Sequence, residues 1–407
     1  MMRSVLRRRE MQHNLLLFLP FFCFLLSGCR KDRPLSDIPS VSEYRTVLVY
    51  LGTDNEFRPE AAQKIEQLKS NWSRTVDGNL LVYADTGENP VLVHIYHTER
   101  RGNVADTIET YLPENSANPA TFARVLDKVR SYRPAASYGL VVLSHATGWL
   151  PAEMSYPAIR LKSAGSLPAG EGEGRSTKSI IQDKSTNESD NYLELSDFAD
   201  AIPYHLDFII FDACFMGSIE VCYELKDKTD YIVASPAEVL VPGFMYATMM
   251  QHLFAPVPDL TAVAREFYEY YNRQTGFYRS ATVSVVKTAG LENLATVVKD
   301  ATQPDALSNN LENIQTYGYG AQKIYFDMED YLQKLSPEKY NEFQIALSQC
   351  VMYKSHTPEY FSVGTNTMHV INTFGGLSVY LPNSAYPKAN EAYMKLKWAK
   401  RTIANIF

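Results

Sequence analysis

Short apolar runs alternate along the chain with segments whose apolar residues recur every three or four positions. The runs at 45–52, 79–86, 90–98, 138–145, 206–214 and 231–238 are apolar enough to form buried strands. Amphipathic segments at 58–72, 118–132, 195–205 and 217–228 are typical of helices. Nearly continuous apolar strands with helices between them predict an α/β fold, with a mostly parallel sheet covered by helices on both faces.

The C-terminal part of the chain has a different pattern of apolar residues. From about 254 to 370 the pattern is mainly helical, interrupted by one strand-like run at 280–288. A further strand is predicted at 375–382, and a last helix from Pro387. We therefore expect one domain over 45–407 that includes a helix-rich part. Its one break in composition is 161–178, which is rich in Gly and Ser, and we expect a surface loop there.

The first 28 residues have the pattern of an export signal. A basic start with Arg3 and Arg7 precedes the apolar run at 15–26, which is short for a membrane span. The letters LSGC at 26–29 then resemble a bacterial lipobox. This implies a lipoprotein signal peptide over 1–28, lipid on Cys29 and a polar tether over 29–44; the alternative is an ordinary cleaved signal peptide. Several acyl chains would hold the protein stably at a membrane.

Net charge limits the kinds of partner that the protein can bind, and cysteine content identifies a candidate reactive thiol. The net charge is −7, and removing residues 1–28, with four Arg and one Glu, makes it −10. An acidic chain disfavours nucleic acid or anionic lipid as the main partner. Three cysteines then remain in an exported protein, so at least one is unpaired unless it bridges two chains. Cys222 and Cys350 fit apolar helix faces and are expected in the core, which leaves Cys214.

Cys214 and His145 each end a predicted parallel strand. Sites in open α/β sheets gather at the carboxyl ends of the strands, so both side chains are expected in one crevice. An imidazole can convert a thiol into the nucleophilic thiolate, and the N-terminus of the helix that follows Cys214 favours the same charge. The alternative is that Cys214 is a small buried hydrophobic residue.

The blocks SYGLVVLSHATGWLP (137–151) and LDFIIFDACFMGSIEVCYELKDKTDYIVASPAE (206–238) resemble the paired signature of the clostripain family of cysteine peptidases. The likeness extends from RTVLVYLGTDN at 45–55 to GGLSVYLP at 375–382. It implies a caspase-like fold, with His145 as acid/base and Cys214 as nucleophile. It also implies that the backbone N–H groups of Ala146 and Cys214 bind the oxyanion.

Two departures from that family concern the substrate. Ala146 replaces the usual Gly after the histidine, and would be strained if the position needs a positive φ. The family prefers Arg or Lys before the scissile bond. Asp212 matches the acidic position that would bind this cation, but 239–246 has no second carboxylate and Glu238 is the nearest candidate. We therefore expect a preference for Arg or Lys before the scissile bond that is weaker than in the family.

The expected function is that of a cysteine endopeptidase, anchored to the bacterial cell envelope, that cleaves peptides or proteins after Arg or Lys. Family members are often activated by a cut between the two motifs, which makes Lys162, Arg175 and Lys178 candidate processing sites. No cofactor is implied, no compact acidic cluster indicates a metal loop, and a calcium requirement is left open. The alternatives are an inactive envelope lipoprotein that serves as a binding or scaffold protein, and a hydrolase of non-peptide acyl bonds.

Overall fold

The computed structural model describes residues 42–73, 76–151, 180–184, 191–302, 311–319 and 322–403. All of them belong to one compact unit, Val41–Phe407. The predicted lipidation site Cys29 and the candidate processing sites Lys162, Arg175 and Lys178 lie outside the described residues. No helix in the described part of the chain is long and apolar enough to cross a membrane.

A nine-stranded sheet forms the centre of this unit, in the order β13-β10-β9-β8-β5-β1-β2-β3-β4. Its five central strands, from β9 to β2, run parallel, and the two strands at each edge pair antiparallel. The predicted α/β fold with a mostly parallel centre is confirmed. The strands are β1 (Ser42–Gly52), β2 (Gly78–Asp85), β3 (Val91–Thr98), β4 (Gly102–Thr110), β5 (Ala135–Leu143), β8 (Leu206–Asp212), β9 (Thr229–Ala234), β10 (Thr282–Lys287) and β13 (Val351–His356).

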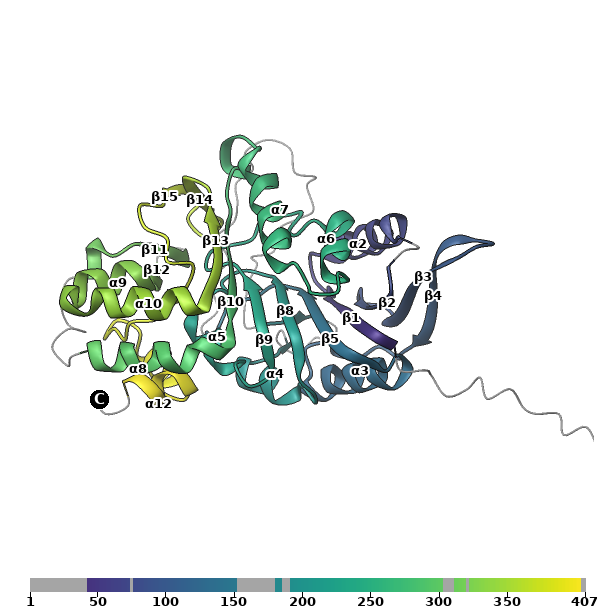
Figure 1. Cartoon of the computed structure of the whole chain (residues 1–407), viewed down its shortest axis with the longest axis horizontal. Helices are drawn as coiled ribbons and strands as arrows, with labels where there is room; N and C mark the ends of the chain where they lie inside the picture. The colour runs from purple at the N-terminus through teal and green to yellow at the C-terminus, as the bar shows by residue number, and fades with distance from the viewer. Residues whose placement is uncertain are drawn as a thin grey trace, which may run out of the picture. The chain divides into compact units, whose positions relative to one another are not determined.

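Helices cover both faces of the sheet, because each central strand is apolar on both sides. Val47 and Val49 of β1 pack into one cluster of buried side chains, whereas Leu48 and Tyr50 pack into the other. In Figure 1, α2, α6 and α7 lie on one side of the sheet, and α3 and α4 on the other. The helices are α2 (Arg58–Asn71), α3 (Pro119–Tyr132), α4 (Leu195–Ala201), α5 (Ile219–Glu224), α6 (Tyr246–Leu253), α7 (Leu260–Asn272), α8 (Leu291–Ala301), α9 (Met328–Leu335), α10 (Tyr340–Cys350), α11 (Pro387–Tyr393) and α12 (Lys397–Thr402).

The C-terminal part contains more strands than the sequence predicted. The predicted strand at 375–382 shrinks to β16, which pairs with β12 rather than with the main sheet.

The antiparallel edge strands of the main sheet, β4 and β13, were also missed, because their residues alternate only weakly. In β4 just Val104 is buried. The smaller sheets consist of β11 (Thr316–Tyr319), β12 (Gln322–Asp327) and β16 (Ser378–Val379); β14 (Glu359–Ser362) and β15 (Thr367–Val370); and β6 (Gln182–Asp183) and β7 (Asn191–Tyr192).

The cysteines are placed as the helical pattern predicted. Cys222 in α5 and Cys350 at the end of α10 are fully buried, and neither forms a disulfide. Cys214 is also a free thiol, but it is only partly buried. The two helical cysteines therefore belong to the core, and Cys214 remains the candidate for chemistry.

Candidate active site

The sheet brings the two candidate catalytic residues to the same edge. β5 and β8 are neighbouring parallel strands, and Leu143 lies opposite Asp212 as their last registered pair. His145 and Cys214 each follow two residues beyond that pair. Because both strands point the same way, both residues leave the sheet at its carboxyl edge, where α/β proteins build their sites.

A tight turn holds Cys214 where β8 ends. Phe215 has a left-handed backbone with a φ of 60°, which is costly for a residue with a side chain. Its N–H donates to the carbonyl of Ala237 at 3.0 Å, and the N–H of Gly217 donates to Ser235 at 2.8 Å. A Cβ on Gly217 would lie 2.5 Å from the nitrogen of Pro236, so only glycine fits there. These bonds fix the turn against the loop after β9.

The thiol of Cys214 is neutral in this environment. Its Sγ accepts a hydrogen bond from the N–H of Val239 at 3.3 Å and lies 3.8 Å from the carbonyl oxygen of the same residue. Burial and, to a smaller extent, the nearby charge of Glu238 raise the pKa of Cys214 to about 12. A base is therefore needed to make the thiolate.

His145 is held by residues of the loop that follows β1. Its Nε2 lies 3.1 Å from Oε2 of Glu56, and its ring stacks on Phe57 with the ring centres 4.2 Å apart. The other oxygen of Glu56 pairs with Nζ of Lys184 at 2.5 Å. Within the described residues no hydrogen bond joins His145 to Cys214, and a catalytic pair does not need one before substrate binds.

The residue after His145 is not strained. Ala146 is buried and is not among the residues with positive φ, so the strain considered for this position does not arise. The left-handed conformation falls on Gly148, with a φ of 64°, where a Cβ would meet the carbonyl oxygen of Phe215 at 2.7 Å. Tyr325 braces both turns: its ring stacks on Phe215, and its hydroxyl donates to the carbonyl of Thr147.

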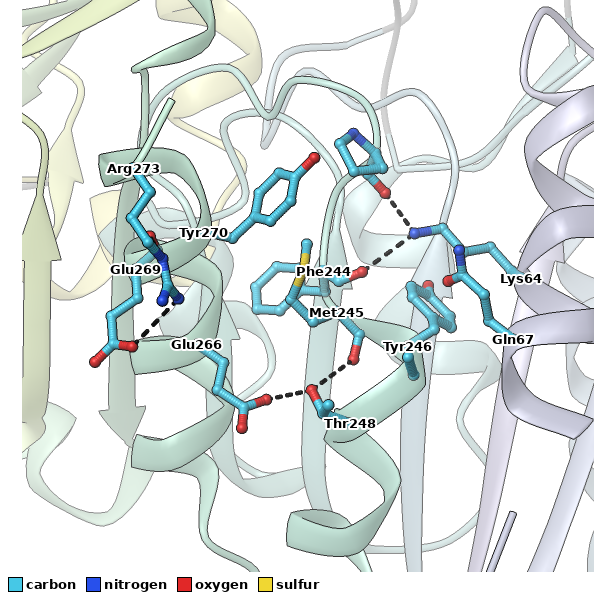
Figure 2. A pocket seen from close by; sticks show the side chains of 12 residues that line it. Lys64, Gln67, Phe244, Met245, Tyr246, Thr248, Glu266, Glu269, Tyr270 and Arg273 are labelled. Atoms are coloured by element: carbon cyan, nitrogen blue, oxygen red, sulfur yellow. Dashed lines mark hydrogen bonds and ion pairs between the residues drawn. The ribbon is translucent and has the colours of Figure 1, made fainter. Parts of the chain in front are cut away.

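Asp212 lies under the loop after β9, near a buried lysine. Its Oδ1 accepts the N–H of Phe244 at 3.2 Å, and the buried hydroxyl of Tyr246 lies close enough to favour its charged form. Burial raises the pKa of Asp212, and the positive charge of Lys64 opposes that rise. The ammonium of Lys64 donates to the carbonyls of Pro242 and Phe244 (Figure 2). A cation of the chain itself thus lies near the carboxylate.

Glu238 uses its carboxylate within the fold. Its Oε2 accepts the N–H of Val363, in the turn between β14 and β15. Burial raises the pKa of Glu238 to about 7, against the backbone hydrogen bonds from Val363 and Gly364. Glu238 is close enough to raise the pKa of Cys214, and one of its oxygens is already occupied by a backbone hydrogen bond.

The pocket drawn in Figure 2 is lined in part by Lys64 and Phe244, but not by Asp212 or Glu238. It has a volume of about 530 Å³ and is lined by parts of α2, α6 and α7 and the loop before α6. Neither His145 nor Cys214 lines it. In the described part of the chain, no group of three or more His, Cys, Asp or Glu side chains is arranged to hold a metal ion.

Sequence reasoning missed Glu56, Phe57, Lys184 and Tyr325. The first two follow β1, which pairs with β5, so the rule that sites collect at parallel strand ends would have pointed to them. Nothing in the pattern marks Lys184, which is distant in sequence, or Tyr325, which comes from the small sheet.

Known proteins resemble this chain in sequence. A sequence model of the clostripain family matches residues 49–395. The chain belongs to the clostripain family. It is 22% identical to clostripain of Hathewaya histolytica over 87% of this chain and 79% of that protein.

Solved family structures agree in fold. An inactive zymogen C11 protease from Parabacteroides distasonis is 33% identical, with a TM-score of 0.74, over 90% of this chain and 99% of that one. A secreted C11 cysteine protease from Bacteroides thetaiotaomicron, solved with an irreversible peptide inhibitor, is 26% identical, with a TM-score of 0.77, over 89% and 100%. The chain is therefore a clostripain-family cysteine peptidase with the predicted caspase-like fold.

Proposed function

We propose that this clostripain-family enzyme is an endopeptidase in which Cys214 is the nucleophile and His145 the acid and base. The observation that carries this is the shared register of β5 and β8, which delivers both residues to one sheet edge. The partly buried thiol needs a base, and His145 supplies an imidazole at that edge.

Proton transfer between the two residues accounts for the reaction. The thiol proton moves to His145 while Sγ attacks the scissile carbonyl. The C–N bond then breaks, and the same proton passes to the leaving amine, which leaves an acyl group on Cys214. Water attacks that thioester, gives a proton to His145 and releases the acid, after which the imidazole returns the proton to sulfur.

The oxyanion formed in each step would be bound by backbone N–H groups, as the family resemblance implies. The amides of Ala146 and Cys214 donate to no other described residue, so both are available for this role. Preorganised donors of this kind are usually a major part of catalysis.

An irreversible peptidyl ketone inhibitor tests this function. It should label the wild-type protein on Cys214, as shown by peptide mapping, and label neither Cys214→Ala nor His145→Ala at a comparable rate. Hydrolysis of a fluorogenic peptide should be lost in the same two variants. Undiminished peptide hydrolysis in Cys214→Ala would exclude the dyad and favour the scaffold alternative.

Anchoring to the cell envelope is the second part of the proposal. It rests on the sequence alone, in which the basic start, the apolar run and LSGC occur in the order that lipoprotein processing requires. Mass spectrometry of the mature N-terminal peptide should find Cys29 as the first residue, carrying lipid. Cleavage elsewhere, with an unmodified Cys29, would contradict it.

A further inference from the structure

Glu56 lies beside His145 although it comes from another strand end. It follows β1 by four residues, and β1 is the neighbour of β5 in the sheet. The side chains of Glu56 and His145 are only 20% and 14% exposed. The 3.1 Å contact between Oε2 and Nε2 is therefore largely shielded from water, where a charge-assisted hydrogen bond is stronger.

The loop that carries Glu56 is fixed from several sides. The side chain of Asn55 accepts the N–H of Phe57 at 2.9 Å and donates to the carbonyls of Gly52, at 3.1 Å, and Gln182, at 3.0 Å. The N–H of Lys184 donates to the carbonyl of Asp54 at 2.9 Å. The backbone that carries Glu56 is therefore preorganised, as is required of a residue that orients the imidazole of His145.

The negative charge of Glu56 sets which ring nitrogen of His145 carries a proton. Burial alone would raise the pKa of Glu56, but the hydrogen bonds from His145 and Lys184 outweigh it and hold the pKa well below its ordinary value. A carboxylate only accepts hydrogen bonds, so Nε2 of His145 must carry a proton. The other ring nitrogen, Nδ1, is then the one left to exchange a proton with sulfur.

We propose that Glu56 is a positioning residue of this enzyme, which holds His145 with Nε2–H toward the carboxylate and stabilises the imidazolium formed during catalysis. This rests on the proposed roles of His145 and Cys214. When the proton of Sγ moves to Nδ1, the ring becomes positive beside the negative carboxylate, and the bond to Glu56 strengthens. When Nδ1–H passes to the leaving amine, the ring returns to its neutral form with Nε2–H unchanged.

The substitution Glu56→Gln tests the charge with little change of shape, because an oxygen remains to accept from Nε2. We expect kcat/KM to fall at least about tenfold, mainly through kcat. The acidic limb of the pH profile, where the imidazolium loses its proton and becomes able to act as a base, should shift down by about one pH unit, since a nearby opposite charge typically shifts a pKa by that much or more. A merely structural role would not move this limb.

Two further variants test whether the effect depends on the charge of Glu56. Lys184→Met removes the cation that competes with His145 for Glu56, so the acidic limb should shift upward, opposite to the effect of Glu56→Gln. Glu329→Gln is the matched control, because the pair of Glu329 with Lys354 is 2.7 Å long and its side chains are 16% and 37% exposed, against 20% and 35% for Glu56 and Lys184. Its kcat/KM and pH profile should equal those of the wild type.

Wild-type kcat/KM and an unshifted acidic limb in Glu56→Gln would overturn the inference. If that variant does not fold, an unshifted limb in Lys184→Met overturns it equally. Failure of the proposed function looks different: wild type and Glu329→Gln would then both hydrolyse no peptide and resist the peptidyl ketone.

Discussion

Position, rather than residue type, distinguishes three cysteines of this chain. Cys222 and Cys350 are fully buried on helices, where burial raises the thiol pKa, and neither bonds to a basic side chain within the described residues. Cys214 has the same intrinsic chemistry and a similarly raised pKa, but it follows a parallel strand beside the one that leads to His145. If Cys214 is the nucleophile, its reactivity has to come from a partner.

Alanine substitutions separate these roles. Cys214→Ala should abolish peptide hydrolysis and leave the melting temperature nearly unchanged, because the thiol makes only weak hydrogen bonds to Val239. Cys222→Ala should leave kcat/KM intact but lower the free energy of unfolding by about 1 kcal/mol or more, because a buried atom is removed from the core. Fluorogenic assays and thermal melts of both proteins check this. The reverse pattern would make Cys214 a core residue.

The sequence points to single residues where one strand end suffices. His145 and Cys214 could be named as candidates because each closes an apolar run. Glu56 was missed, although the strand-end rule points to its loop, because its partner His145 is 89 residues away in the sequence. The strain considered for Ala146 does not arise, because the left-handed positions, Gly148 and Phe215, are set by contact between two turns.

Elements buried on both faces were predictable, and elements at the edges were not. The apolar runs of β1, β5 and β8 predict strands covered on both faces, since only such a strand needs a continuously apolar sequence. The edge strand β4 has one buried residue, and β11 to β15 are short, so hydrophobic periodicity carries little signal there. Their pairing is decided by the surfaces against which they pack.

The loop between β9 and α6 should govern selectivity before the scissile bond. It covers Asp212 and binds the ammonium of Lys64 through two carbonyl oxygens. If Asp212 faces the substrate's cation, Lys64 already offsets part of its charge, and a second cation is repelled. We expect kcat/KM for a peptide with Arg before the scissile bond to exceed that for the neutral isostere citrulline by only about tenfold, which corresponds to about 1.4 kcal/mol.

Substitutions of the pair give opposite results in the same assay. Asp212→Asn should remove the remaining preference for arginine over citrulline, whereas Lys64→Met should increase it. Each ratio is measured within one variant, so partial unfolding cancels. An unchanged ratio in Asp212→Asn would mean that this carboxylate is structural and that specificity lies elsewhere.

The stability of the whole molecule should decline from mildly acidic to mildly basic pH through its buried carboxyl groups. Glu220 is fully buried; its Oε1 accepts the N–H of Tyr380 at 2.7 Å, and its Oε2 has no hydrogen-bond partner among the described residues. Burial raises the pKa of Glu220 to about 7. A raised folded pKa favours the protonated fold, so this contribution is present below the unfolded pKa, near 4.3, and is lost as pH rises through 7.

Glu220→Gln should flatten this dependence. Because the amide does not ionise, the loss of unfolding free energy between pH 5 and pH 8 should shrink by about 2–3 kcal/mol relative to the wild type. Urea denaturation at both pH values measures it, with the exposed Glu391→Gln as control. An equal pH dependence in wild type and Glu220→Gln would show that Glu220 does not titrate differently in the fold.

Processing between the two catalytic motifs is the last property of the whole chain that can be tested. The segment that contains Lys162, Arg175 and Lys178 joins two firmly held ends. Trp149 and Leu150 are buried before it, and after it Ile180 and Ile181 are fully buried and exchange backbone hydrogen bonds with Leu193, both at 3.1 Å. A cut within the segment would therefore leave two fragments that stay together through the core.

We expect active preparations to contain two associated fragments that separate only on denaturation. Replacing Lys162, Arg175 and Lys178 together by Ala should keep the protein in one chain and lower kcat/KM, with little effect on the melting temperature, because the packing on both flanks is retained. Intact mass spectrometry beside the peptide assay makes the comparison. A wild-type preparation that is fully active as a single chain would show that the enzyme reaches its active state without cleavage, through the strand-end geometry alone.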